Sequence, residues 1–235
     1  MKYKRILLKL SGEAMMGEQK GGIDPNVVKS IAAQIKELRD RNIDVGIVIG
    51  GGNIIRGMVA ASMGMDRVTA DHMGMLATVI NALALQDAVE HLGIPVRVLS
   101  GIEMQKIAES FIRRRAMSHL SKGRVVIFGA GTGNPFFSTD TAAALRAIEI
   151  NAEVILKATN VDGVYSEDPK KNPEAIRFEQ ITFQDVLERN LRVMDGAAIA
   201  ICRESGIPIL VFDMKVPGNL VAAVEGAAAG TLVGN

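Results

Sequence analysis

Short apolar runs recur along the chain, and each is followed by a segment with helical spacing. The runs RILLKL at 5–10, DVGIVI at 44–49 and EVILKA at 153–158 are largely apolar and do not alternate with polar residues. Strands that are buried on both faces have this pattern, and they occur in mainly parallel sheets covered by helices on both sides. The sequence therefore predicts a three-layer α/β/α sandwich with a mainly parallel central sheet.

The remaining elements follow from the same periodicity. Strands are expected at 5–10, 44–49, 94–99, 124–128, 153–158 and 207–212. Helices are expected at about 25–41, 73–91, 103–120, 141–150, 182–189 and 195–205, before a closing Ala-rich helix and a short strand. Asp24 and Pro25 mark a helix start, as N-cap and first helical residue. The 73–91 segment is apolar nearly all round, which predicts burial in a core or in a subunit interface.

Composition narrows the class of protein. The chain has 235 residues, of which 48% are hydrophobic and 23% charged, and its net charge is +1. Such a balance is ordinary for a globular protein and creates no general attraction to nucleic acid or membrane. The single cysteine, Cys202, excludes an intrachain disulfide and is expected to be a buried thiol. No apolar run approaches the roughly 18 residues of a membrane span, so a cytoplasmic protein is expected.

Two polar features are interpreted without a ligand. The run Arg113-Arg114-Arg115 is more readily explained as a solvated helix face than as an anion site. The three histidines, at positions 72, 91 and 119, share no spacing and have no cysteine partners, so no protein metal site is expected.

Glycine and cationic residues follow the first two strands. Ligands of such sheets bind at the carboxyl ends of the strands. Lys9 lies near the end of a core strand, where it could face a bound phosphate or extend its ammonium group to the surface. Gly50-Gly51-Gly52 could let the backbone approach a ligand, with Arg56 on phosphate oxygens, or could be a flexible connector. This stretch alone does not separate the two interpretations.

A long strand-to-helix loop has the sequence GAGTGNPFFSTDTAAA, residues 129–144. Alternating glycines permit positive φ, and Ser138 to Thr141 place hydroxyls and backbone N–H groups at the start of a helix. A turn with a good N-cap and no ligand is the alternative. The length of the loop and the exposed-looking pair Phe136-Phe137 favour a ligand.

These loops together indicate phosphate chemistry. With a fourth that begins at Thr159, they are rich in Gly, Ser or Thr, and Lys or Arg. The chain has no G-x-x-x-x-G-K-[ST] motif and no G-x-G-x-x-G motif at its first strand-to-helix turn, which argues against a P-loop or dinucleotide-binding protein. Two separate glycine-rich sites suggest two phosphate-bearing ligands, as in a kinase whose acceptor is itself a phosphate.

Five segments resemble the bacterial-type uridylate kinases of the amino acid kinase superfamily. They are KLSGEA at 9–14, VIGGGNIIRG at 48–57, DHMGMLAT at 71–78, AGTGNPFFSTD at 130–140 and LKATNVDGVYSEDP at 156–169. The resemblance covers nearly the whole chain. It implies transfer of the ATP γ-phosphoryl group to UMP with Mg²⁺ and no redox or organic cofactor, in pyrimidine nucleotide biosynthesis. It also implies a homohexamer that GTP activates and UTP inhibits, with no requirement for nucleic acid or membrane.

The resemblance also implies roles for individual residues. The ATP site would comprise Lys9, Leu10, Ser11, Gly12, Gly52, Arg56, Thr159, Asn160, Tyr165 and Asp168. The UMP site would comprise Gly51, Asp71 at the ribose, Thr132, Gly133, Asn134, Pro135, Phe136, Phe137, Ser138 and Thr139. Lys9, Arg56 and Asp140 would be catalytic, with Asp140 organising the lysine. The GTP-response loop would be Gly17, Glu18, Gln19, Lys20, Gly21 and Gly22, although this stretch varies in the family.

The resulting expectation is one amino-acid-kinase domain over 1–235. Its acceptor lobe would span about 1–150 and its ATP lobe about 151–235. Two alternatives stay open. The chain could be another kinase of the superfamily, acting on acetylglutamate, aspartate or carbamate, or a non-catalytic nucleotide sensor of the same fold.

Overall fold

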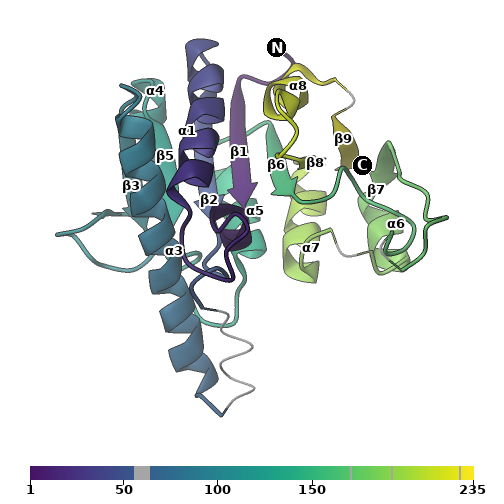
Figure 1. The fold of residues 1–235 in the computed structure, drawn as a ribbon, viewed down its shortest axis with the longest axis horizontal. Coiled ribbons are helices and arrows are strands. Elements are labelled where there is room, and N and C mark those ends of the chain that lie inside the picture. The colour runs from purple at the N-terminus through teal and green to yellow at the C-terminus, as the bar shows by residue number, and fades with distance from the viewer. Residues whose placement is uncertain (56–63, 170, 192, 228) are drawn as a thin grey trace.

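A single nine-stranded sheet runs through the protein. The computed structural model describes residues 1–55, 64–169, 171–191, 193–227 and 229–235 (Figure 1). The strand order is β4-β3-β5-β2-β1-β6-β8-β9-β7, and every pairing is parallel except β8 with β9. The strands are β1 Arg5–Leu10, β2 Asp44–Ile49, β3 Val96–Ser100, β4 Glu109–Ser110, β5 Val125–Gly129, β6 Val154–Thr159, β7 Gln180–Thr182, β8 Ile209–Asp213 and β9 Gly230–Gly234. The prediction of a mainly parallel sheet is confirmed.

Helices cover both faces of this sheet, which makes the three layers. They are α1 Pro25–Asp40, α3 Arg67–Glu90, α4 Arg113–Ser121, α5 Thr139–Glu149, α6 Phe183–Glu188, α7 Gly196–Ser205 and α8 Asn219–Glu225, with a 3-10 turn, η1, at Gly12–Met15. One apolar core joins α1, α3 and α8 to the face of β1 that carries Ile6 and Leu8. A second core joins α4, α5, α6 and α7 to the opposite face, which carries Leu7. Because side chains alternate along a strand, Lys9 lies on the same face as Leu7 and α5.

Helix α1 begins as its sequence predicts. The Asp24 carboxylate caps it by accepting a hydrogen bond of 2.9 Å from the backbone N–H of Asn26, and Pro25 is the first helical residue. The closing helix and strand are likewise present, as α8 and β9.

Three expected boundaries differ from the structure. The helix expected at 103–120 is wrong in its first half, because Glu109 and Ser110 pair with β3 as the edge strand β4 and the helix begins only at Arg113. Helix α3 begins at Arg67, six residues before the expected start, with Asp66 as its N-cap. Strand β7 was not expected, since its three residues are too few to show a period.

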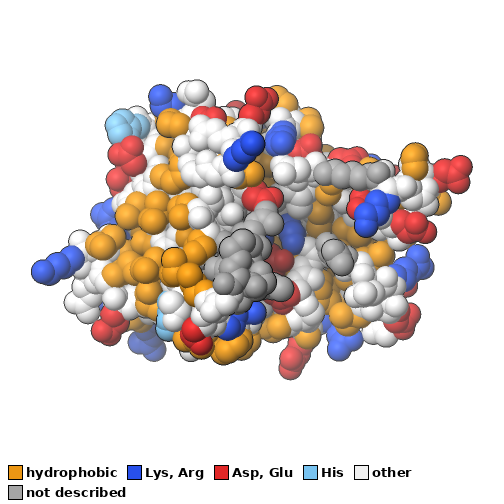
Figure 2. Space-filling view, turned by 60° about the horizontal axis from the view of Figure 1, so that its bottom comes forward, with side chains coloured by type: hydrophobic (Ala, Val, Ile, Leu, Met, Phe, Trp, Pro, Cys, Tyr) orange, Lys and Arg blue, Asp and Glu red, His pale blue; other side chains and the backbone are white. Residues whose placement is uncertain are grey.

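Helix α3 is buried on one side only. Ala82, Leu85 and Val89 are fully buried in the core that it shares with α1, whereas Leu76 and Ile80 are about half exposed. It is long and apolar enough to cross a membrane by length and composition, but here one side of it packs inside the fold. Hydrophobic side chains gather on the left half of the face shown in Figure 2.

Cys202 and the arginine run behave as expected. Cys202 is buried in α7, and burial raises the pKa of its thiol to about 12. The side chains of Arg113, Arg114 and Arg115 are exposed. Among the described residues, no group of three or more His, Cys, Asp or Glu side chains is arranged to hold a metal ion.

Candidate active site

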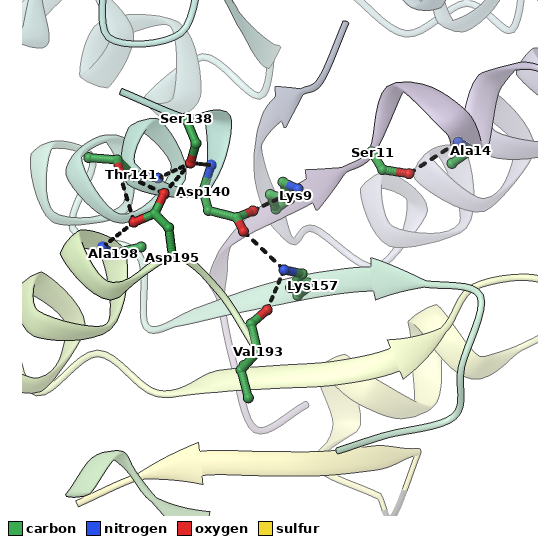
Figure 3. A network of polar contacts seen from close by, with 10 residues as sticks. All are labelled: Lys9, Ser11, Ala14, Ser138, Asp140, Thr141, Lys157, Val193, Asp195 and Ala198. Carbon is green, nitrogen blue, oxygen red and sulfur yellow. Dashed lines mark hydrogen bonds and ion pairs between the residues drawn. The ribbon is translucent and has the colours of Figure 1, made fainter. Parts of the chain in front are cut away.

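Two lysines and one aspartate form an ionic cluster at the carboxyl ends of the central strands (Figure 3). Lys9 of β1 and Lys157 of β6 are partners in the parallel register of these neighbouring strands, so their side chains lie on the same face. Asp140 of α5 reaches between them. Its Oδ1 lies 2.7 Å from the Lys9 Nζ and its Oδ2 lies 3.1 Å from the Lys157 Nζ. The cluster contains two cations and one anion and therefore carries one excess positive charge.

Burial and the neighbouring charges both shift the pKa values of the cluster. Burial alone would raise the pKa of Asp140, but the ammonium groups of Lys9 and Lys157 outweigh it and hold that pKa below its ordinary value. Burial and the charge of Lys9 lower the pKa of Lys157, and attraction to Asp140 only partly offsets them. One carboxylate cannot neutralise two buried ammonium groups, so the cluster is suited to receive a second anion, such as a phosphate.

A capping network holds Asp140 in place. The Ser138 Oγ accepts hydrogen bonds from the backbone N–H groups of Asp140, at 2.9 Å, and Thr141, at 3.3 Å, and so caps α5. The hydroxyls of Ser138 and Thr141 donate to the carboxylate of Asp195, which also caps α7 through the backbone N–H of Ala198. Asp195 therefore ties α5 to α7 at the point where α5 presents Asp140.

Sequence analysis assigned no site role to Lys157 or Asp195. Lys157 lies in the LKATNVDG segment, one strand away from Lys9. It is two residues before the end of β6, whereas Lys9 is one residue before the end of β1, so only the register shows that the two lysines are partners. Asp195 precedes an ordinary helix, and its sequence signal is that of any N-cap. The backbone carbonyl of Val193, which accepts a hydrogen bond from Lys157, has no sequence signal at all.

The glycine turns after β1 and β2 pack tightly against each other. A Cβ atom at Gly12 would lie 2.6 Å from the Gly52 nitrogen, and one at Gly51 would lie 2.8 Å from the Ala77 Cβ of α3. Such distances leave no room for a side chain, so the flexible-connector interpretation is wrong for Gly50 to Gly52. Both turns follow directly on the carboxyl ends of β1 and β2, and the Gly50 N–H joins them by donating to the Leu10 carbonyl at 2.9 Å.

Two buried asparagines secure the turn after β2. The side-chain amides of Asn53 and Asn81 of α3 bond reciprocally, at 3.0 and 2.7 Å. Asn81 also donates to the Gly50 carbonyl at 2.7 Å, and Asn53 donates to the Gly22 carbonyl at 2.8 Å. The expected GTP-response loop, Gly17 to Gly22, thus ends in direct contact with the glycine turn.

A pocket of about 130 Å³ lies between this turn, α3 and the loop after β5. Its lining includes six residues expected at UMP, which are Gly51, Asp71, Thr132, Asn134, Phe137 and Thr139. Thr78 closes its floor, because its Oγ1 accepts a 2.7 Å hydrogen bond from the backbone N–H of Ala130. The structure thus gathers most of the expected acceptor residues around one cavity, although they come from three separate segments.

The loop after β5 has an unusual backbone. Gly131 and Gly133 have positive φ, as the alternating glycines predict, and so do Ala130 and Phe136. The rings of Phe136 and Phe137 are 66% and 56% exposed. Large exposed aromatic side chains on a strained loop are more readily explained by a ligand than by core packing.

Five of the expected ATP residues border two further pockets, each of about 440 Å³, at the end of β6. Ser11 and Asn160 line the first, and Tyr165 and Asp168 line the second. Thr159 borders both, and its hydroxyl donates to the Val161 carbonyl at 2.6 Å. Arg56, expected at the phosphates, lies outside the described residues.

Known proteins are similar to this chain in sequence and fold. The amino acid kinase family matches residues 4–213. A solved UMP kinase from Bacillus anthracis is 41% identical with a TM-score of 0.96, over 100% of this chain and 97% of its own. A UMP kinase from Ureaplasma parvum is 42% identical with a TM-score of 0.94, over 100% of both chains. A uridylate kinase from Archaeoglobus fulgidus is 30% identical with a TM-score of 0.74, over 97% of this chain and 99% of its own.

Proposed function

Since the chain belongs to the amino acid kinase family, we propose that it is a UMP kinase, which transfers the γ-phosphoryl group of ATP to UMP and yields UDP and ADP. The observation that carries this proposal is the buried Lys9–Asp140–Lys157 cluster beside a pocket lined by Asp71, Thr132 and Phe137. Full-length similarity to solved UMP kinases at 41–42% identity supports the choice of acceptor.

The reaction needs alignment and charge neutralisation more than proton transfer. The nucleophile is an oxygen of the UMP phosphate, whose second pKa is about 6, so it is already mostly ionised at neutral pH. No general base is required. Two phosphates that repel each other must instead be held in line, and fixed positive groups achieve this at little reorganisation cost.

We assign these tasks to residues of the ionic cluster and the glycine turns. Lys9 contacts the transferred phosphoryl group, and Lys157 stabilises the charge on the ATP side, because it lies on β6 next to the expected adenosine residues. Asp140 keeps the two ammonium groups apart and oriented. The N–H groups of the Gly12 and Gly52 turns bind phosphate oxygens, with Arg56 as a further cation, and ATP enters as its Mg²⁺ complex.

The two nucleotides bind on opposite sides of this cluster. UMP occupies the pocket beside α3, with its ribose at Asp71 and its base near Phe137. The ATP adenosine binds at Thr159, Asn160, Tyr165 and Asp168. This division matches the proposed acceptor lobe at about 1–150 and ATP lobe at about 151–235.

Assembly and regulation follow as part of the same proposal. The half-exposed apolar side chains of α3 support a subunit interface within a homohexamer. Activation by GTP through Gly17 to Gly22 is supported by the contact of Gly22 with Asn53 of the glycine turn. We further propose inhibition by UTP, a role in pyrimidine nucleotide biosynthesis and a cytoplasmic location.

A coupled ADP-release assay tests the activity. The acceptors UMP, CMP, AMP, acetylglutamate and aspartate are offered in parallel, each with ATP and Mg²⁺. Turnover with UMP alone is expected. Turnover with an amino acid would identify another kinase of the family, and no turnover with any acceptor would favour a nucleotide sensor.

A further inference from the structure

Three residues link the start of α3 to the tip of the loop after β5, and we name them the acceptor latch: Arg67, Asp71 and Phe136. The Nε of Arg67 donates to both carboxylate oxygens of Asp71, one helical turn later, at 2.9 Å each. The Oδ2 of Asp71 also accepts a 2.8 Å hydrogen bond from the backbone N–H of Phe136. The guanidinium carbon of Arg67 lies 5.6 Å from the centre of the Phe136 ring, within range of a cation–π contact.

The latch holds a strained residue. Phe136 has a φ of 72°, in the left-handed region that large side chains rarely adopt. Its ring is 66% exposed, so core packing does not enforce this conformation. The hydrogen bond to Asp71 and the ring contact to Arg67 stabilise it. Strain of this kind persists where the surroundings determine it, and it concentrates at ligand sites.

The latch also leaves Asp71 with capacity for a ligand. Each carboxylate oxygen can accept two hydrogen bonds. The Oδ2 already accepts from Arg67 and Phe136, whereas Oδ1 accepts from Arg67 alone among the described residues. Asp71 lines the acceptor pocket and its side chain is only 15% exposed. Arg67 therefore keeps this carboxylate oriented, with one acceptor position of Oδ1 that no described residue occupies and that a hydroxyl donor could use.

We propose that Arg67 is a positioning residue for the acceptor nucleotide. It assembles Asp71 and Phe136 into one wall of the pocket before UMP arrives, and it acts through these two residues rather than by touching the reacting phosphates. This inference rests on the proposed function. Its physical basis is preorganisation: ordering the wall in advance lowers the entropic cost of binding the nucleotide.

The test compares Arg67→Met and Arg67→Lys with the wild type in the coupled assay. Arg67→Met removes the charge at similar length, and it should raise KM for UMP roughly tenfold while KM for ATP stays within about twofold. Arg67→Lys keeps the charge but loses the planar guanidinium, and it should give an intermediate KM for UMP. Because the ion pair is partly exposed, the melting temperature should stay within about 3 °C of the wild type.

Deoxynucleotide acceptors distinguish a positioning role of Arg67, exerted through Asp71, from a general structural effect of replacing Arg67. UMP, 2′-deoxy-UMP and 3′-deoxy-UMP are compared as acceptors for the wild type and Arg67→Met. For the analogue that lacks the hydroxyl bound by Asp71, KM should differ little between Arg67→Met and the wild type. The preference of Arg67→Met for UMP over that analogue should therefore be severalfold smaller than the preference of the wild type. A uniform loss with all three acceptors would mean that Arg67 does not act through Asp71 and would overturn the inference.

Lys36→Met is the matched control. Lys36 forms an exposed i,i+4 ion pair with Asp40 at the C-terminal end of α1, away from the pocket, and its loss should leave both KM values unchanged. If the wild type phosphorylates UMP but Arg67→Met has an unchanged or lower KM for UMP, the role of Arg67 is overturned and the proposed function stands. No UMP turnover by the wild type would overturn the proposed function and the role of Arg67 with it.

Discussion

Replacing Asp140 with asparagine should expose how the ionic cluster works. The substitution keeps the shape of the side chain but removes the single anion between Lys9 and Lys157. Asp140 is mostly buried, with 17% of its side chain exposed, and both ammonium groups lie within 3.1 Å of its oxygens. The variant leaves two cations close together in a site with little solvent.

The expected magnitude follows from these distances. Two unit charges about 3 Å apart interact by about 5 kcal/mol at an effective dielectric constant near 20. Much of this attraction only offsets the cost of removing the charged groups from water. Breaking a buried ion pair typically costs about 3–5 kcal/mol. Lysine can lose its proton to relieve repulsion, so we expect the free energy of unfolding to fall by about 3 kcal/mol near neutral pH. Loss of the ordered cations should also lower kcat by roughly 100-fold or more.

The pH dependence of the free energy of unfolding shows whether repulsion between the two lysines causes the destabilisation. The pKa of Lys157 already lies below its ordinary value of 10.5, and losing the attraction of Asp140 should lower it further. A folded-state pKa below the unfolded value makes the free energy of unfolding rise with pH between the two values, because the unfolded chain binds more protons. Urea unfolding from pH 6 to 9.5 should therefore show the destabilisation of Asp140→Asn shrinking as pH rises.

Asp44→Asn is a matched control. Asp44 lies between Arg5 and Arg39 at the opposite end of β2, at 2.9 and 3.5 Å. Arginine does not lose its proton in this range, so the control should be destabilised by an amount that does not vary over this pH range, and it should keep its kcat. A pH-independent destabilisation of Asp140→Asn, or a kcat within threefold of wild type, would refute the account of the cluster.

Four further measurements test other parts of the site. Lys9→Ala should lower kcat at least ~100-fold with folding intact, as judged by circular dichroism, and near-normal turnover would exclude the assignment of Lys9. Phe137→Ala should raise KM for UMP far more than KM for ATP, and equal changes would contradict its place beside the acceptor. Asn81→Leu should lower the free energy of unfolding by about 2–3 kcal/mol, because it leaves Asn53 and the Gly50 carbonyl with unpaired buried groups; a change under 1 kcal/mol in urea unfolding would argue against the amide pair. Cys202 should react with iodoacetamide at pH 8.5 only after unfolding, because burial raises its pKa to about 12, and fast labelling of the native protein would contradict this.

The sequence alone determined the architecture and most of the residues around the site. Unbroken apolar runs predicted the central strands, since strands buried on both faces have no polar side to show. Local capping chemistry predicted the start of α1 at Asp24 and Pro25. The alternating glycines predicted the positive φ of Gly131 and Gly133. Buried strands, helix caps and glycine turns could be predicted because each depends on residues that are neighbours in the chain.

Elements whose identity depends on distant partners were not predicted. The segment at Glu109 and Ser110 has no strand period of its own, and it becomes β4 only because β3 offers hydrogen bonds to it. The start of α3 at Arg67, six residues before the expected start, places Asp71 in the second turn of the helix. That shift is what sets Arg67 and Asp71 one turn apart.

Only the tertiary structure decided how the charges combine. Lys9 and Lys157 are far apart in the chain, and the register of β1 with β6 makes them neighbours. Asp195 ties α5 to α7 through Ser138 and Thr141, and no sequence pattern distinguishes it from a simple cap. Local patterns indicate which side chains are buried, whereas strand order and register determine which buried charges meet, and this meeting creates the proposed anion-binding site.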